Sequence, residues 1–269
     1  MSTKSPAQRR QPPIERYLLI LETIAAANTS LTLTELTNLL QLPKPTVHRL
    51  VNVLEGAGAL ESGTGHQRSF SIGRRMWRIL QLGQSLDTVR NYAQLVCDEL
   101  TEKIRETSYI VKLGIDDVQT VTRSVPDQGY RLHVLPGKEL PPHAAASAKA
   151  IIAYQDERIQ EKILSKPLKK LTSHTTTDPN IVRQHLNEVK KQGFAVCDRE
   201  IDEDIMAYAT PVILPKAGVL YSIGVTAPSN RLNQQPATYW VEHLQQAAEK
   251  FALLISESKS SLLESTITD

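Results

Sequence analysis

Two short amphipathic segments separated by a proline-flanked turn lie within residues 32–58, TLTELTNLLQLPKPTVHRLVNVLEGAG. Thr32 and Glu35 have the spacing of a capping box, in which a hydroxyl and a carboxylate satisfy two free N–H groups at a helix start. We expect the second helix to begin near Lys44-Pro45, because proline suits the first helical position. The first helix should bury one apolar stripe, formed by Leu36, Leu39 and Leu40.

The second helix has an apolar face and a polar face. Its apolar residues recur at i, i+3, i+4 and i+7, which predicts that they face the core: Val47, Leu50, Val51 and Leu54. Two helices joined by a tight turn are typical of the helix-turn-helix, which places its second helix in the DNA major groove. We therefore predict phosphate or base contacts from the polar face, formed by Lys44, Thr46, His48, Arg49 and Asn52.

The flanking sequence predicts a winged form of this motif. Residues 14–27 form an amphipathic helix that should pack beneath the other two. Two strand candidates, Leu60–Ser62 and Ser69–Ile72, flank a glycine-rich tip. Such a hairpin suits a wing beside the DNA backbone, so the basic tip residues His66 and Arg68 join the predicted DNA contacts.

The distribution of charge distinguishes a DNA-binding domain from an ordinary small helical bundle, which would have similar amphipathic helices. Residues 1–83 contain ten Lys/Arg and five Asp/Glu, a net charge of +5. The remaining residues contain 21 Lys/Arg and 24 Asp/Glu, a net charge of −3. A basic N-terminal module on an acidic body is the asymmetry expected of a protein that binds double-stranded DNA.

Composition limits the remaining possibilities. A chain of 269 residues suits one large domain or two ordinary ones, and no apolar run approaches the 18 residues of a membrane span. Residues 1–13 are basic and proline-rich without the apolar segment of a secretory signal, so we expect a disordered tail. Cys97 and Cys197 have no metal-site spacing and suggest reduced thiols in a cytoplasmic protein.

After a winged domain over residues 14–74, we expect a helical linker over 75–90 and an effector-binding domain over 91–260. Met76, Ile79 and Leu80 share a face of the linker and are candidates for dimer contacts, although the helix could simply belong to the second domain. Strand and helix patterns are mixed beyond residue 107, which predicts an α+β fold with an antiparallel sheet. The strand candidates are 107–115, 116–125, 130–135, 194–197, 208–214 and 218–226, and the helix candidates are 144–155, 156–164, 178–193 and 237–258.

From residue 14 onward, the chain resembles the IclR (isocitrate lyase regulator) family of transcriptional regulators. The matching segments are LPKPTVHRLVNVLEGAGAL (42–60), PPHAAASAKAIIAY (141–154), GFAVCDREI (193–201), AYATPV (207–212) and SIGVTAPSNRL (222–232). The resemblance implies a winged helix-turn-helix, a connecting helix and a GAF-like effector domain. It also implies homodimers or homotetramers on operator DNA. We expect no cofactor. The residues that match the family's effector pocket are Leu132, Leu140, Ala146, Ser147, Cys197, Ala207, Gly224 and Thr226.

The small residues Ala145–Ala148 add a physical argument for this pocket. A helix N-terminus offers free N–H groups to a carboxylate, and four small side chains would let a ligand approach the backbone. Tight helix–sheet packing would favour the same residues. Because Cys197 and Ala207 stand where some relatives have polar side chains, we expect an organic acid that is partly apolar, for example aromatic. Tyr130 and Tyr208 could add aromatic wall or serve core packing.

Other chemistry has weaker support. The acidic run at 198–204 fits a solvated loop better than a metal site, because no His or Cys joins it at ligand spacing. His143 could act as a base, but we find no nucleophile elbow, P-loop or dinucleotide-binding motif. The principal hypothesis is a ligand-responsive transcription factor that controls a catabolic operon. The alternative is a small-molecule enzyme or sensor whose N-terminal module mediates protein contacts.

Overall fold

A computed structural model describes residues 12–27, 29–63, 67–115, 117–127, 137 and 139–265, with only the backbone described over 257–265. The chain divides into two compact units, one ending at Gly83 and the other beginning at Gln84. Within the described residues, no helix is both long enough and apolar enough to cross a bilayer. Several predictions made from the sequence fall outside the described residues: His66, Tyr130, Leu132, residues 1–11 of the tail and the strand candidate 130–135.

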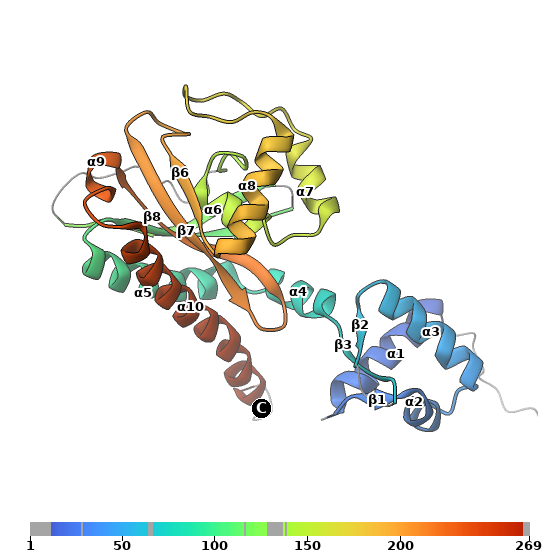
Figure 1. Cartoon of the computed structure of the whole chain (residues 1–269). Helices are drawn as coiled ribbons and strands as arrows, with labels where there is room; N and C mark the ends of the chain where they lie inside the picture. The colour runs from blue at the N-terminus through green and yellow to red at the C-terminus, as the bar shows by residue number, and fades with distance from the viewer. Residues whose placement is uncertain are drawn as a thin grey trace, which may run out of the picture. The chain divides into compact units, whose positions relative to one another are not determined.

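The N-terminal unit is a winged helix-turn-helix, as predicted. A three-stranded antiparallel sheet in the order β1-β3-β2 accompanies its helices (Figure 1). The short strand β1, which pairs Leu31 with Phe70, was not expected from the sequence. The elements are α1 (Pro13–Ala26), β1 (Leu31–Thr32), α2 (Leu33–Leu40), α3 (Lys44–Gly56), β2 (Leu60–Ser62), β3 (Ser69–Ile72) and α4 (Arg74–Leu82).

Capping and apolar periodicity explain the helix-turn-helix. Thr32 and Glu35 form the predicted capping box at the start of α2. The buried face of α3 consists of the four predicted residues, Val47, Leu50, Val51 and Leu54. The predicted stripe of α2 was wrong at Leu39, whose side chain is 61% exposed. Leu33 packs on the core in its place, because 33, 36 and 40 share a face at the spacing i, i+3, i+7.

The C-terminal unit has a five-stranded antiparallel sheet in the order β5-β4-β8-β7-β6. The predicted α+β class is therefore confirmed. The strands β7 and β8 are buried along almost their whole length, since helices cover both of their faces. The strands are β4 (Thr107–Leu113), β5 (Val118–Ser124), β6 (Ala195–Asp198), β7 (Ile205–Leu214) and β8 (Gly218–Pro228).

Helices cover the two faces of this sheet. One face packs against α5 and α10, and the other packs against α6 (Figure 1). On the first face the Tyr221 ring meets the Phe251 ring edge-on, and on the second Ser222 Oγ donates to the Ser147 carbonyl at 2.8 Å. Adjacent residues of β8 therefore face different helices, as strand geometry requires. The helices are α5 (Leu86–Ile104), α6 (Ala146–Ile152), α7 (Glu157–Leu164), α8 (Pro179–Gln192), α9 (Ser229–Leu232) and α10 (Ala237–Ser265).

Helix ends follow their capping residues. The Asp178 side chain accepts a hydrogen bond at the start of α8, and Gly193 ends that helix with a φ of 83°. The predicted helix over 144–155 is shorter than expected, because α6 spans only Ala146–Ile152 and its cap residue Ala145 has no side-chain acceptor. The N-terminus of such a short helix is a weaker anion site than the sequence suggested.

Candidate functional site

The polar face of α3 is open to solvent. Lys44, His48, Arg49 and Asn52 are exposed, and Thr46 is half-buried. The amide of Asn52 lies 3.4 Å from Nδ1 of His48, one helical turn away. These five side chains lie outside the buried stripe, so α3 offers a largely polar surface that is interrupted by Val53, whose side chain is 50% exposed.

The wing is tied to the recognition helix by an ion pair. The guanidinium of Arg68 bonds the Glu55 carboxylate and also lies 5.4 Å from the centroid of the Phe70 ring. The hydrogen bond from Arg68 holds the pKa of Glu55 below its usual value. Arg68 is thus partly neutralised within the protein, which the sequence did not indicate.

In the second unit, strand register brings predicted effector residues together. Cys197 pairs with Ala207, and Ala207 pairs with Thr226. These three residues form one row across β6, β7 and β8, with neighbouring strands about 4.8 Å apart. The row continues to Thr107 on β4, a buried residue that pairs with Thr226. Thr226 Oγ1 donates to the Met206 carbonyl at 3.1 Å, so its hydroxyl is already anchored.

The adjacent row contains Gly224 and a residue that sequence reasoning missed. Gly224 pairs with Tyr109 of β4, and both belong to the face of the sheet that α6 covers. The apolar run Tyr109-Ile110-Val111 indicates a buried strand, but the strand that pairs with it lies more than 100 residues away. Tyr208 neighbours Ala207 along β7 and therefore lies on the other face, so it does not join this site.

Ser147 of α6 lies over this part of the sheet. Ser147 and Ala146 are both buried. Burial raises the pKa of the Tyr109 phenol, an effect that a hydrogen bond with the Ser147 side chain partly offsets. Burial likewise raises the pKa of Cys197 to about 11, so the thiol stays protonated at neutral pH.

A buried ion pair between α6 and the turn after β6 lies near Cys197. Lys149 Nζ lies 2.5 Å from Glu200 Oε1, and the two side chains are 4% and 11% exposed. The expectation that the acidic run is a solvated loop was therefore wrong for Glu200, which turns inward because α6 offers it a cation. Within the residues searched, no group of His, Cys, Asp or Glu could hold a metal ion.

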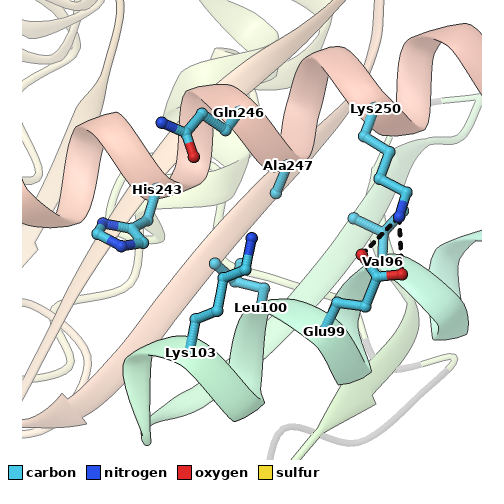
Figure 2. A pocket seen from close by; sticks show the side chains of 8 residues that line it. All are labelled: Val96, Glu99, Leu100, Lys103, His243, Gln246, Ala247 and Lys250. Atoms are coloured by element: carbon cyan, nitrogen blue, oxygen red, sulfur yellow. Dashed lines mark hydrogen bonds and ion pairs between the residues drawn. The ribbon is translucent and has the colours of Figure 1, made fainter.

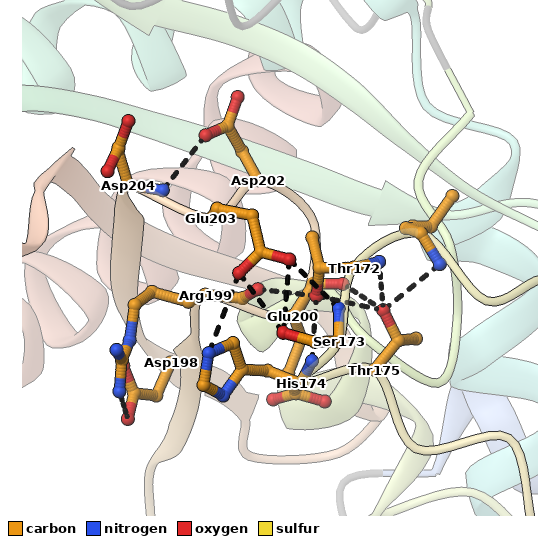
Figure 3. Close-up of polar contacts among 11 residues, drawn as sticks. Thr172, Ser173, His174, Thr175, Asp198, Arg199, Glu200, Asp202, Glu203 and Asp204 are labelled. Atoms are coloured by element: carbon orange, nitrogen blue, oxygen red, sulfur yellow. Dashed lines mark hydrogen bonds and ion pairs between the residues drawn. The ribbon is translucent and has the colours of Figure 1, made fainter.

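The loop formed by residues 172–175 hydrogen-bonds to the turn between β6 and β7. Thr175 Oγ1 donates to the Glu200 carbonyl at 2.6 Å, and Ser173 N donates to the Glu203 carboxylate at 2.9 Å (Figure 3). His174 Nε2 lies 3.5 Å from the same carboxylate. These contacts fix the backbone on either side of Glu200, and hence the end of the strand that carries Cys197.

Two cavities lie elsewhere in this unit. Leu140 lines one of about 520 Å³ together with Pro141, Pro142 and His143, whose Nε2 lies 2.9 Å from the Lys169 carbonyl. A smaller groove of about 60 Å³ runs between α5 and α10, where Lys250 bonds Glu99 (Figure 2). Leu140 thus lines a cavity distinct from the row of Cys197, Ala207 and Thr226.

The arrangement defines a class of protein: a DNA-binding regulator with a winged helix-turn-helix and a separate α+β domain. Two family models match, the IclR helix-turn-helix domain over residues 13–63 and the bacterial transcriptional regulator IclR C-terminal domain over residues 84–253. The chain belongs to the IclR family of ligand-responsive transcriptional regulators.

Curated relatives support this assignment. The chain is 28% identical over 245 residues to the probable transcriptional regulator SauR of Cupriavidus necator, a match that covers 90% of this chain and 96% of that protein. It is 26% identical over 255 residues to the transcriptional repressor IclR of Escherichia coli, covering 93% and 92%. These relatives are named as regulators, which favours the principal hypothesis over an enzyme.

Solved structures show the same fold. An IclR homolog from Microbacterium hydrocarbonoxydans, complexed with 4-hydroxybenzoate, has a TM-score of 0.58 and 24% identity, covering 90% of this chain and 98% of that one. The Thermotoga maritima IclR structure has a TM-score of 0.59 and 17% identity, covering 90% and 98%.

Proposed function

We propose that this protein binds operator DNA through α3 and the wing, and that a small organic acid in the site on the sheet changes its affinity for that DNA. The observation that carries the proposal is the exposed polar face of α3, opposite a fully buried stripe, within a matched helix-turn-helix domain. Lys44 and Arg49 are suited to phosphate or guanine contacts, and Thr46, His48 and Asn52 to further polar contacts.

We propose a two-fold assembly on the DNA. A single winged module contacts little DNA, whereas a dimer doubles the contacts and selects for half-site spacing. Ile79 and Leu80 of α4 are 53% and 51% exposed, and Met76 is half-buried, so this apolar face is available to a second subunit. We expect a dimer or tetramer by analytical ultracentrifugation at micromolar concentration. A monomer there would contradict this part of the proposal.

The ligand that we propose is a partly apolar carboxylic acid, such as an aromatic acid. Cys197 and Ala207 give the row an apolar, uncharged surface, while Ser147 and Thr226 place hydroxyls beside it. The regulated genes are proposed to form a catabolic operon. One relative, 24% identical to this chain, is named the acetate operon repressor, which is consistent with control of an operon.

The test uses the full chain and the DNA that surrounds its own gene. Fragments of that DNA are assayed by gel shift with and without pyruvate, benzoate and 4-hydroxybenzoate. We expect one fragment to bind with an affinity that falls steeply with salt, and one acid to change that affinity. If no fragment competes better than unrelated DNA, regulation of neighbouring genes is excluded. If a fragment binds but no acid changes the affinity, operator binding stands and the proposed response to an organic acid is contradicted.

A further inference from the structure

One apolar side chain lies on the exposed side of the recognition helix. Val53 is 50% exposed, and it follows Arg49 by four residues, about one turn along α3. Residues four apart lie on the same side of a helix, so Val53 adjoins Arg49 in the surface that we propose enters the major groove. The DNA contacts predicted from the sequence were polar residues and did not include Val53.

The position of Val53 makes it informative. A single exposed apolar side chain needs no explanation in itself, because folded proteins expose many of them. Here, however, Arg49 and Asn52 on the same side are polar and exposed, and the buried stripe of α3 lies elsewhere. Valine is also a weak helix former, because its branched side chain loses freedom in a helix. Core packing and helix propensity therefore give little reason for valine at this position.

Valine has the chemistry to read one particular base. Its two methyl groups are nearly fixed in space, because one rotamer dominates for valine in a helix. The apolar group that a base presents in the major groove is the C5-methyl group of thymine. A rigid methyl group can pack on it with little further loss of side-chain freedom. Such a contact would complement Arg49 and Asn52, whose side chains suit guanine and adenine.

The last residue of α3 on this side is a glycine. Gly56 follows Val53 by three residues, is exposed, and would place an added Cβ in open space, with no atom within 4 Å. Its φ lies outside the left-handed region, so neither crowding nor backbone strain in the protein requires glycine here. Alanine would favour the helix more. A helix end without a side chain leaves room for the backbone to approach DNA.

We propose that Val53 packs against the C5-methyl group of a thymine in the major groove, and that Gly56 gives this end of α3 the room to approach the DNA. This inference rests on the proposed operator-binding function and names a base that the site reads. Val53 is then a specificity-determining residue of the recognition helix.

The test removes the two methyl-bearing partners separately. Duplexes that bind the full chain are selected from a random pool, and each thymine of the enriched site is replaced in turn by uracil, which lacks only the methyl group. We expect at least one replacement to weaken wild-type binding about 4-fold, because the burial of one methyl group is lost. In Val53→Ala, the same replacement should change the affinity by less than about 1.5-fold, since the partner is already absent.

Leu39→Ala supplies the matched control. It removes another exposed apolar side chain of the same unit, from α2, and should respond to uracil as the wild type does.

The outcomes separate this inference from the proposed function. If no duplex is enriched, operator binding fails, and the inference falls with it. If a duplex is enriched but no uracil replacement weakens wild-type binding, the function stands and the inference is overturned. An equal loss on uracil in the wild type and Val53→Ala would assign the methyl contact to another side chain and would also overturn it.

A second measurement concerns Gly56. Gly56→Ala should raise the Tm by about 1–5 °C, because alanine favours the helix. It should also weaken binding of the selected duplex about 5-fold or more, because the added methyl group fills space needed at the DNA. Thermal melts and fluorescence anisotropy measure the two effects. Unchanged binding by Gly56→Ala would show that this end of α3 stays clear of the DNA, and the inference would be overturned.

Discussion

The recognition helix and the effector site place their functional residues in opposite environments. On α3, the polar side chains proposed to contact DNA are exposed, and the apolar stripe behind them supplies the stability. On the sheet, the proposed effector residues are buried, so the same side chains serve both packing and recognition. Substitutions on α3 should therefore separate function from stability, whereas substitutions at the sheet should affect both.

The largest expected effect is at the buried ion pair. Lys149→Met leaves the Glu200 carboxylate buried without its cation and should destabilise the C-terminal unit by about 3–5 kcal/mol. Urea unfolding followed by circular dichroism measures the change. The double variant Lys149→Met/Glu200→Leu should recover most of the loss, because it removes the unpaired charge as well.

The exposed pair Lys250–Glu99 is the matched control in the same unit. These side chains are 44% and 43% exposed, so solvent screens their attraction. Lys250→Met should change the free energy of unfolding by less than about 1 kcal/mol. Similar losses for Lys149→Met and Lys250→Met would show that burial does not distinguish the two pairs.

Two adjacent residues of α3 should behave in opposite ways. Leu50→Ala empties part of the core and should destabilise the N-terminal unit by about 2–5 kcal/mol. Arg49→Ala should leave stability within about 0.5 kcal/mol of wild type and weaken operator binding by about 1–3 kcal/mol. Thermal melts and fluorescence anisotropy measure the two effects. Exposed Arg183 of α8 supplies the control, since Arg183→Ala should change neither.

The smallest effect concerns the wing. Glu55→Gln releases Arg68, which could then contact a phosphate, so the slope of log K against log salt should steepen by about 0.9 per subunit. Glu22→Gln removes the same charge from α1 without releasing Arg68 and should leave the slope unchanged. Identical slopes for the two variants would show that the Arg68–Glu55 pair does not restrain the wing.

The Arg68–Glu55 pair should make the stability of the N-terminal unit depend on pH. Because Arg68 lowers the pKa of Glu55, the pair stabilises the fold fully above pH 4.5, and this contribution is lost as the pH falls through the lowered pKa. Glu55→Gln should therefore lower the Tm slightly at pH 7, and the difference from wild type should shrink steadily as the pH falls below 4.5. A difference that did not change with pH would assign the effect to something other than ionisation.

The sequence predicted the recognition helix and wing better than it predicted the site on the sheet. The wing strands and the buried stripe of α3 were predicted correctly, because capping and periodicity act over a few residues. Tyr109, Thr107 and the inward turn of Glu200 were missed. Each depends on pairing between segments far apart in the chain: β4 with β8, and α6 with the turn after β6. Local patterns contain no information about such pairing.

The central claim is that an exposed face of α3 binds DNA and that a buried site between α6 and the sheet controls this binding. The direct test is one anisotropy titration of a labelled operator, with and without the bound acid, for wild type, Arg49→Ala and Ser147→Leu. The account predicts that Arg49→Ala loses operator affinity and still binds the acid, while Ser147→Leu fills the site, keeps operator affinity and loses the response to the acid. If Ser147→Leu responded to the acid as the wild type does, or Arg49→Ala bound the operator equally well, the division of roles would be contradicted.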